Sequence, residues 1–239
     1  MLDYLRLEVH RTLRDAGFVI GGIAMPVMMY LLFTNLGDGS DGGWKTGSMI
    51  GMAAYGAVGS ALNTGGGVAE DKVIGWLRQL RVTPMTPREV VLGRALTGSV
   101  TVLPAIAAVL AAGGLVNGVR LEVWQWAAVA VLLWLGSIPF TLLGLGNGYL
   151  LTAQTTGVAN MVCNLGLSVV GGLWFPLALF PGWLRSLSGF TPTNRIAQLG
   201  TSVADGNAPA LGAVVVLTAW LLAFGSYAVV SYRRAARTI

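Results

Sequence analysis

Charged residues are absent from five long stretches of the chain, and this segregation limits what the chain can fold into. Only 10% of the 239 residues are charged and 54% are hydrophobic, whereas about a quarter of the residues in a soluble domain are charged. A membrane-spanning helix needs about 20 mostly apolar residues. The uncharged stretches reach or exceed that length, so the sequence predicts an all-α membrane protein. They cover residues 16–37, 46–69, 95–119, 123–184 and 206–232.

These stretches predict six membrane-spanning helices. Four stretches hold one span each, and the longest holds two, divided near the polar, glycine-containing segment 146–157. We therefore expect a single transmembrane domain over 1–239, with spans at about 17–37, 47–69, 92–116, 124–146, 157–180 and 209–232.

The basic residues predict the orientation of these spans. With six spans, both termini lie on the same side of the membrane as the loops 70–94 and 146–157. That side carries eleven of the fifteen Lys and Arg residues, and the other side carries only Lys45, Arg120, Arg185 and Arg195. The positive-inside rule then places both termini in the cytoplasm.

The residue content excludes several kinds of chemistry. His10 is the only histidine, Cys163 is the only cysteine, and the predicted spans contain no interior charged residue. We therefore predict no catalytic residue and no metal site. No Walker-type phosphate loop is present, so ATP hydrolysis would need another subunit. The net charge of +5 fits loop bias and contact with anionic membrane lipid; it does not indicate nucleic-acid binding.

Residues 1–16 have the pattern of a helix that lies in the membrane interface. Leu2, Leu5, Val9 and Leu13 recur at helical spacing, and charged residues lie between them. This amphipathic pattern predicts an interfacial helix before the first span. The alternative is a charged leader that only sets the topology.

Small residues recur every four positions in two of the predicted spans. Small side chains at this spacing allow close approach of helix backbones in lipid. Packing within one chain and packing between two copies are both compatible with the pattern. The two rows are Gly47, Gly51, Tyr55, Gly59, Asn63 and Gly67 in the second span, and Gly136, Phe140, Gly144 and Gly148 in the fourth.

The fifth span carries a polar ridge of Asn160, Asn164 and Ser168. An unpaired amide in hydrocarbon is costly, so this ridge should face protein or water. Together with Tyr55 and Asn63 of the second span, we interpret it as a candidate translocation pathway or dimer seam. Ordinary hydrogen bonding between helices is the alternative.

The cytoplasmic segment 70–84 predicts a short amphipathic helix. Glu70 or Asp71 can begin it, since carboxylates favour a helix N-terminus, and Pro84 ends it. Ile74, Leu77 and Leu80 form an apolar ridge beside Trp76, which indicates a docking surface for a cytosolic partner. The alternative is a solvated loop whose basic residues only set the topology.

At this point the sequence resembles the membrane subunits of type-2 ABC exporters, the group that includes daunorubicin-resistance-type permeases. The resemblance covers the whole chain and rests on two motifs in the expected loops. The first motif is Glu70, Asp71, Gly75, Leu77, Arg78, Leu80, Arg81, Thr83-Pro84 and Gly93; the second is Gly172, Pro176, Pro181, Trp183, Leu184 and Pro192.

The resemblance implies a dimer of six-span subunits, identical or paralogous, that works with two cytosolic ABC ATPase subunits. ATP and Mg would bind to those partners, and this chain would bind no cofactor of its own. The segment 70–84 would be the ATPase-coupling helix, and 180–200 a re-entrant segment in the outer leaflet. The coupling residues would be Glu70, Asp71, Ile74, Gly75, Trp76, Leu77, Arg78, Leu80, Arg81 and Pro84, and those of the outer segment Phe175, Pro176, Pro181 and Trp183.

The same resemblance implies export through a bacterial inner membrane. Because the predicted external loops are short and no capture domain is evident, we expect an amphipathic small molecule, such as an antibiotic or lipid-like compound, as substrate. Two other classes remain open: an energy-independent secondary carrier, and a membrane scaffold or sensor subunit that does not transport.

Overall fold

The computed structural model describes residues 17, 19–36, 42–73 and 87–237. Within them every regular element is a helix, so this part of the chain confirms the all-α class. The elements are the π-helix η1 (Val19–Ala24), α3 (Met25–Leu36), α4 (Gly42–Val73), α6 (Pro87–Val100), α7 (Leu103–Leu115), α8 (Val123–Leu150), α9 (Ala153–Val170), the 3-10 helix η2 (Leu177–Leu179), α10 (Gly182–Ser188), α11 (Pro192–Ala204) and α12 (Leu211–Arg237). The expected interfacial helix at 1–16 lies outside the described residues.

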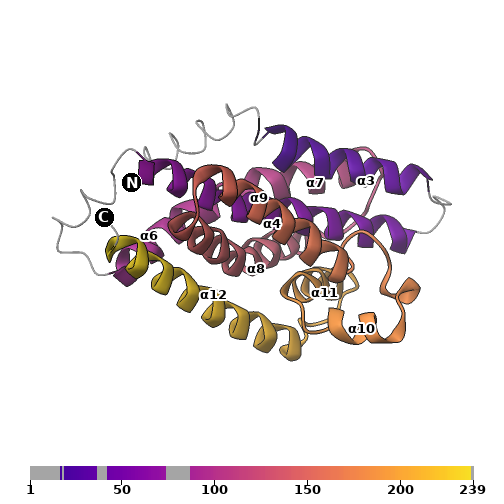
Figure 1. The fold of residues 1–239 in the computed structure, drawn as a ribbon. Coiled ribbons are helices and arrows are strands. Elements are labelled where there is room, and N and C mark those ends of the chain that lie inside the picture. Colours follow the sequence, from indigo (N-terminus) through magenta and orange to yellow (C-terminus); the bar gives the residue numbers. More distant parts are fainter. Residues whose placement is uncertain (1–16, 18, 37–41, 74–86, 238–239) are drawn as a thin grey trace.

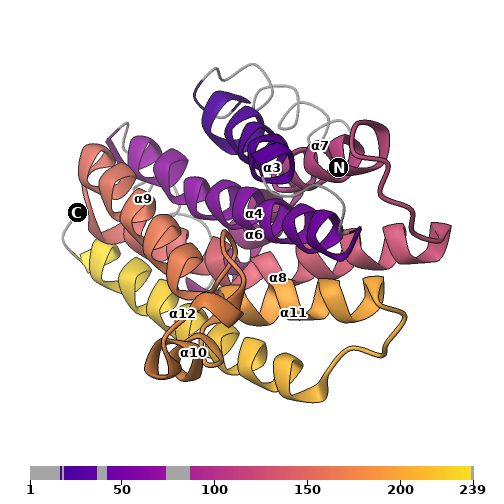
Figure 2. The same cartoon turned by 90° about the vertical axis from the view of Figure 1, so that its right-hand side faces the viewer.

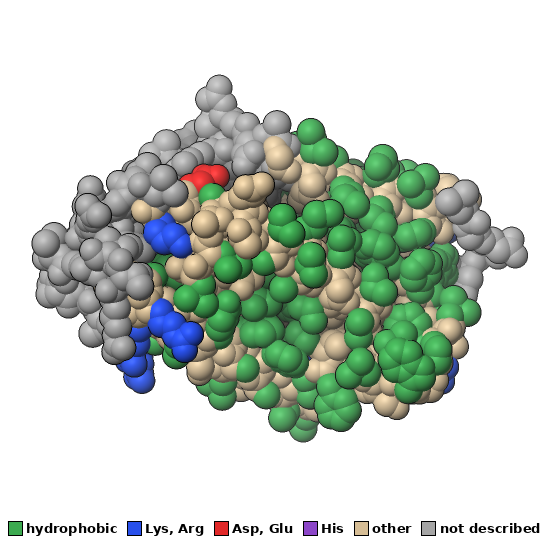
Figure 3. All heavy atoms as spheres, viewed as in Figure 1, with side chains coloured by type: hydrophobic (Ala, Val, Ile, Leu, Met, Phe, Trp, Pro, Cys, Tyr) green, Lys and Arg blue, Asp and Glu red, His purple; other side chains and the backbone are tan. Residues whose placement is uncertain are grey.

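The long helices run back and forth between two ends of the molecule (Figure 1). At one end α4 finishes, α6 begins, α8 gives way to α9, and α12 finishes. We call this the basic end, because Figure 3 shows Lys and Arg side chains gathered there beside a largely apolar face. Its described basic residues are Lys72, Arg88, Arg94, Arg233 and Arg234. The helices α10 and α11 lie toward the opposite end.

Helices α4 and α8 form the centre of the bundle. Figure 2 shows α3 and α7 on one side of them and α11 and α12 on the other. The two central helices approach closely where a Cβ atom on Gly65 would overlap the carbonyl oxygen of Gly144, and one on Gly148 would overlap that of Gly65. The small residues Gly144 and Gly148 therefore serve packing within one chain.

Among the described residues, three helical segments are long and apolar enough to cross a membrane, by length and composition: Arg88–Leu115, Val123–Leu150 and Leu211–Ala236. Val19–Asn35 is a shorter apolar helix. Helix α4 is longer than any of these segments, but its glycines, Asn63 and terminal charges make it less apolar. The six-span topology therefore stays a prediction, which the back-and-forth course of the helices supports.

The expected third span is divided in two. Helix α6 ends at Val100 and α7 begins at Leu103, with Pro104 in the first turn of α7. Proline lacks the N–H that would continue the helix, and its ring clashes with the carbonyl four residues earlier. Charge patterning does not reveal this break, because residues 95–119 are uncharged on both sides of it.

The expected fifth span, 157–180, is wrong at both ends. Helix α9 begins at Ala153, only two residues after α8, and it ends at Val170. Gly172 follows with φ of +70°, a conformation that glycine adopts without steric cost. Thr193 and Asn194 of α11 donate hydrogen bonds to the carbonyls of Leu167 (2.6 Å) and Gly171 (3.2 Å), so α11 caps the shortened helix.

The segment 180–200 contains α10 and most of α11, which continues to Ala204. The buried face of α11, with Ile196, Leu199 and Val203, packs against α4 and α8. At its C-terminal end, Gln125 of α8 donates hydrogen bonds to the carbonyls of Val203 (3.1 Å) and Ala204 (3.2 Å). Helix α11 is thus part of the bundle.

Candidate functional site

The basic end has its own apolar core. Val68 of α4, Val91 of α6, Leu145 of α8 and Tyr232 of α12 belong to one buried cluster. The four helices that meet at this end therefore pack around one hydrophobic core. The segment that was predicted to dock a partner, 70–84, starts from it.

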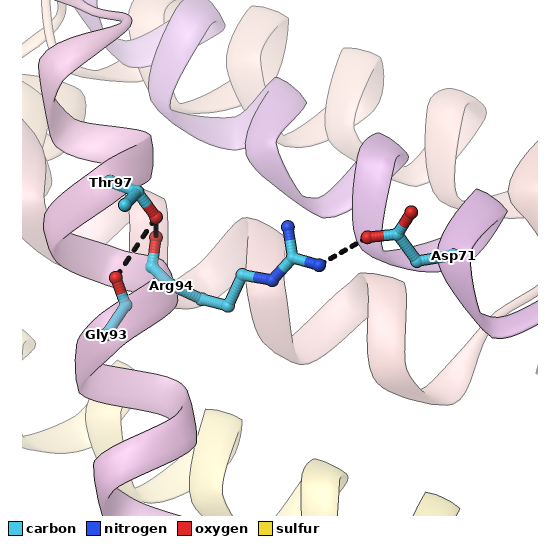
Figure 4. A network of polar contacts seen from close by, with 4 residues as sticks. All are labelled: Asp71, Gly93, Arg94 and Thr97. Carbon is cyan, nitrogen blue, oxygen red and sulfur yellow. Dashed lines mark hydrogen bonds and ion pairs between the residues drawn. The ribbon is translucent and has the colours of Figure 1, made fainter. Parts of the chain in front are cut away.

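An ion pair joins α4 to α6 at this end. Arg94 donates a hydrogen bond to the carboxylate of Asp71, and the two side chains are 25% and 28% exposed (Figure 4). On the same turn of α6, the Thr97 hydroxyl donates to the carbonyls of Gly93 (3.0 Å) and Arg94 (3.1 Å). The ion pair links the two helices that flank the predicted coupling segment.

The expectation that Glu70 or Asp71 begins a separate helix is wrong. Both residues lie in the last turn of α4, which continues to Val73. A carboxylate is unfavourable at a helix C-terminus, because the macrodipole places negative charge there. Arg94 offsets this cost for Asp71, while Glu70 is exposed to solvent.

Lys72 caps a second helix. Its Nζ atom donates to the carbonyls of Gly148 (3.4 Å), Tyr149 (3.1 Å) and Leu151 (2.6 Å) at the end of α8. A cation at this position satisfies carbonyls that lack partners within the helix and complements its dipole. Partial burial lowers the pKa of the Lys72 amine from its ordinary value. Through Asp71 and Lys72, the end of α4 is tied to both α6 and α8.

Most of the predicted coupling residues lie outside the described residues. They are Ile74, Gly75, Trp76, Leu77, Arg78, Leu80, Arg81 and Pro84. Their role in docking stays a prediction, and the described structure places only the two helix ends that flank them.

Four of the five residues that were predicted for a pathway or seam line one groove. Tyr55 and Asn63 of α4 and Asn160 and Asn164 of α9 border a space of about 470 Å³, which Gly21 and its neighbours of η1 close on a third side. A Cβ atom on Gly59 would lie 2.8 Å from the amide of Asn164, so this glycine keeps α4 and α9 close together. The groove combines apolar walls with a few amide groups.

Beneath the groove lies a buried chain of amides that sequence reasoning only partly identified. Asn160 donates to the carbonyl of Leu62 (2.7 Å) and accepts from Asn147 (2.8 Å), whose own oxygen accepts from Tyr227 (2.9 Å). Asn147 was assigned to a loop, but α8 continues past it to Leu150. The signal that could have revealed it is an isolated asparagine within an apolar run. Asn160 therefore forms ordinary hydrogen bonds between helices, which was the alternative interpretation, and it also lines the groove.

Comparison with known proteins identifies the family. The family model described as ABC-2 type transporter matches residues 5–203, which is most of the chain. The chain belongs to this family. It is also similar to YvfS of Bacillus subtilis (strain 168), a candidate transport permease, with 25% identity over 223 residues that cover 91% of this chain and 90% of the relative. The family and the apolar helices make the ABC-2 chain a multi-pass membrane protein.

The remaining predicted residues of the ABC-2 chain lie at its opposite end. Ser168 is fully buried and contacts Asn164 at 3.5 Å, below the groove wall. Phe175 and Pro176 line a second hollow between α4 and α11. Pro181 precedes α10, and Trp183 is 71% exposed. The exposed aromatic ring suits a membrane interface, and the re-entrant depth of this segment stays a prediction.

Proposed function

We propose that this chain is the transmembrane subunit of an ATP-driven exporter. In this proposal it forms six spans, its basic end faces the cytoplasm, and the segment 70–84 docks on separate ABC ATPase subunits. Membership of the ABC-2 type transporter family carries the proposal. The accumulation of basic residues at the end that bears this segment supports the orientation.

The contacts at the basic end offer a route for mechanical coupling. A push on the segment after Val73 would act directly on the end of α4. Because Asp71 is paired with Arg94 and Lys72 binds the end of α8, α6 and α8 would move with it. Helix α4 also carries Tyr55 and Asn63 of the groove, so the same motion would reach the proposed pathway. Such coupling is reciprocal, so substrate should alter the rate of ATP hydrolysis.

The groove supports an amphipathic small molecule, such as an antibiotic or lipid-like compound, as the exported substrate. A site for such a compound needs mostly apolar walls with a few polar anchors. Met161 and Leu165 supply apolar surface beside Asn63 and Asn164. In a dimer with an identical or paralogous subunit, we propose that this face borders the seam along which the substrate leaves.

The decisive experiment is affinity purification of the tagged chain from its native membrane, with identification of the proteins that co-purify. We expect a stoichiometric ABC ATPase, and we expect Leu77→Asp to release it, because a buried carboxylate at the docking ridge is costly. The matched control is Leu179→Asp, since Leu179 is 73% exposed at the opposite end, and this variant should retain the ATPase.

Two outcomes would overturn the proposal. Recovery of the chain alone, still moving solute in liposomes without ATP, would identify a secondary carrier. Recovery of an ATPase whose activity no amphiphile alters, with no ATP-dependent transport, would identify a scaffold or sensor subunit. If only a peptide, a glycan or an ion stimulated the ATPase activity, the chain would still be an exporter subunit, but its substrate would not be an amphipathic small molecule.

A further inference from the structure

A second groove lies on the side of the bundle away from the polar one. It runs between α6, α8 and α12 and has a volume of about 630 Å³. Its walls are apolar over most of their length, with Leu92 and Leu96 on one side and Leu222 and Val230 on the other. These four side chains are 45–67% exposed. All three helices that form the groove belong to segments that are long and apolar enough to cross a membrane.

The groove is apolar along its length and cationic at one end. Arg88, at the start of α6, and Arg233, near the end of α12, both line it at the basic end. Both side chains are exposed. Among the described residues, neither arginine forms an ion pair with a carboxylate, whereas Arg94, six residues after Arg88 on the same helix, is paired with Asp71.

We propose that this groove binds an anionic phospholipid of the cytoplasmic leaflet. An acyl chain would lie along the leucine and valine side chains, and the phosphate would meet the two arginines at the mouth. Guanidinium groups bind phosphate through paired N–H donors, and each basic residue near the leaflet adds to the affinity for anionic lipid. The proposal rests on the orientation given above, in which the basic end faces the cytoplasm.

The other candidate occupant of the groove is a helix from a second copy of the chain. The charge at the mouth of the groove favours the phospholipid over this helix. A second copy would bring another basic end to the same level, because both copies share one orientation in the membrane. The groove already has two cations at its mouth, so a second set would be repelled there. A single anionic headgroup would neutralise the charge.

The test is native mass spectrometry of the detergent-purified chain, titrated with phosphatidylglycerol or with phosphatidylcholine of the same acyl chains. We expect preferential binding of one phosphatidylglycerol, with the preference falling as salt is added. The double variant Arg88→Gln/Arg233→Gln should weaken phosphatidylglycerol binding by on the order of tenfold and leave phosphatidylcholine binding unchanged. Arg120→Gln, an exposed arginine at the opposite end, is the control and should bind normally.

A second pair of variants tests the apolar part of the groove. Ser226 lines it and is exposed, so Ser226→Phe should fill the groove and weaken binding of phosphatidylglycerol. Ala223→Phe adds the same ring to an exposed position of α12 that does not line the groove, and it should have no effect. Equal loss in both variants would contradict the proposed position of the acyl chain.

Two results would overturn the proposal. One is equal affinity for the two lipids in the wild-type chain. The other is efficient disulfide formation between copies that carry Leu222→Cys in a Cys163→Ser background, since this would place a second copy on the groove. Neither measurement involves the ATPase or transport, so the outcome is independent of the co-purification experiment.

Discussion

At the scale of single residues, the Asp71–Arg94 ion pair is the contact that joins α4 to α6 beside the predicted coupling segment. Asp71→Asn should lower the free energy of unfolding by less than about 1 kcal/mol, because the pair is partly exposed. Glu70→Gln is the matched control: it removes a neighbouring carboxylate that is exposed at the same helix end, and it should leave stability unchanged or raise it. Thermal unfolding in detergent, followed by tryptophan fluorescence, measures both. Identical shifts for the two variants would contradict a role for the pair.

Asn160 illustrates a different residue-scale effect, because its amide is buried and both its nitrogen and its oxygen form hydrogen bonds. Asn160→Ala removes two hydrogen bonds and leaves the Leu62 carbonyl and the Asn147 amide without those partners. We expect a loss of about 1–2 kcal/mol, because two interhelical hydrogen bonds are lost and each contributes on average about 0.6 kcal/mol in a membrane protein. Asn63→Ala changes an exposed asparagine of the same groove and should alter stability by less than about 0.5 kcal/mol. Unfolding in SDS measures the stability of both variants. Equal losses would show that the buried hydrogen bonds of Asn160 do not contribute to stability.

At the scale of elements, the approach of α4 to α8 depends on the absence of a side chain at Gly65. In Gly65→Ala the new methyl group would overlap the carbonyl oxygen of Gly144, and backbone atoms cannot rotate away. We expect the helices to separate, with a fall in the yield of monodisperse protein on size-exclusion chromatography. Gly67→Ala, two residues along the same helix, meets no atom within 4 Å. That variant should gain about 0.5–1 kcal/mol from helix propensity, and a similar gain in Gly65→Ala would contradict the observed packing.

At the scale of the whole molecule, the back-and-forth course of the helices predicts which positions share a side of the membrane. In a Cys163→Ser background, we expect Gln154→Cys, in the first turn of α9, to react with an impermeant thiol reagent only from the cytoplasmic side. Asn207→Cys, between α11 and α12, should react only from outside. Both positions are exposed in the fold. If both cysteines were labelled from the same side, α9 would not cross the membrane between them.

The positions of most helices could be predicted from the sequence, because the length and the hydropathy of an uncharged stretch depend only on the residues within it. These properties predicted an all-α protein, and the positions of Lys and Arg predicted the basic residues that the fold gathers at one end. They also located most helices to within a few residues. The family followed from the motifs around 70–93 and 172–192, and the match over residues 5–203 confirms it.

The candidate site was only partly predictable. Tyr55, Asn63, Asn160 and Asn164 were named from spacing, and the fold brings them to one groove. Helical periodicity places residues on one face of a helix, but it does not identify the helix opposite. For that reason the ridges on α4 and α9 were found, while Asn147 and Tyr227 were missed.

The sequence by itself determined what is local and additive: where helices form, which segments are apolar, and where positive charge accumulates. The tertiary structure decided where those helices end and which faces meet. Lys72 caps α8 through a carbonyl 79 residues away, and α11 caps α9 across 26 residues. Gly65 fits only because Gly144 lies opposite. Each of these contacts depends on the position of a distant segment, so no pattern within one stretch of sequence could encode it alone.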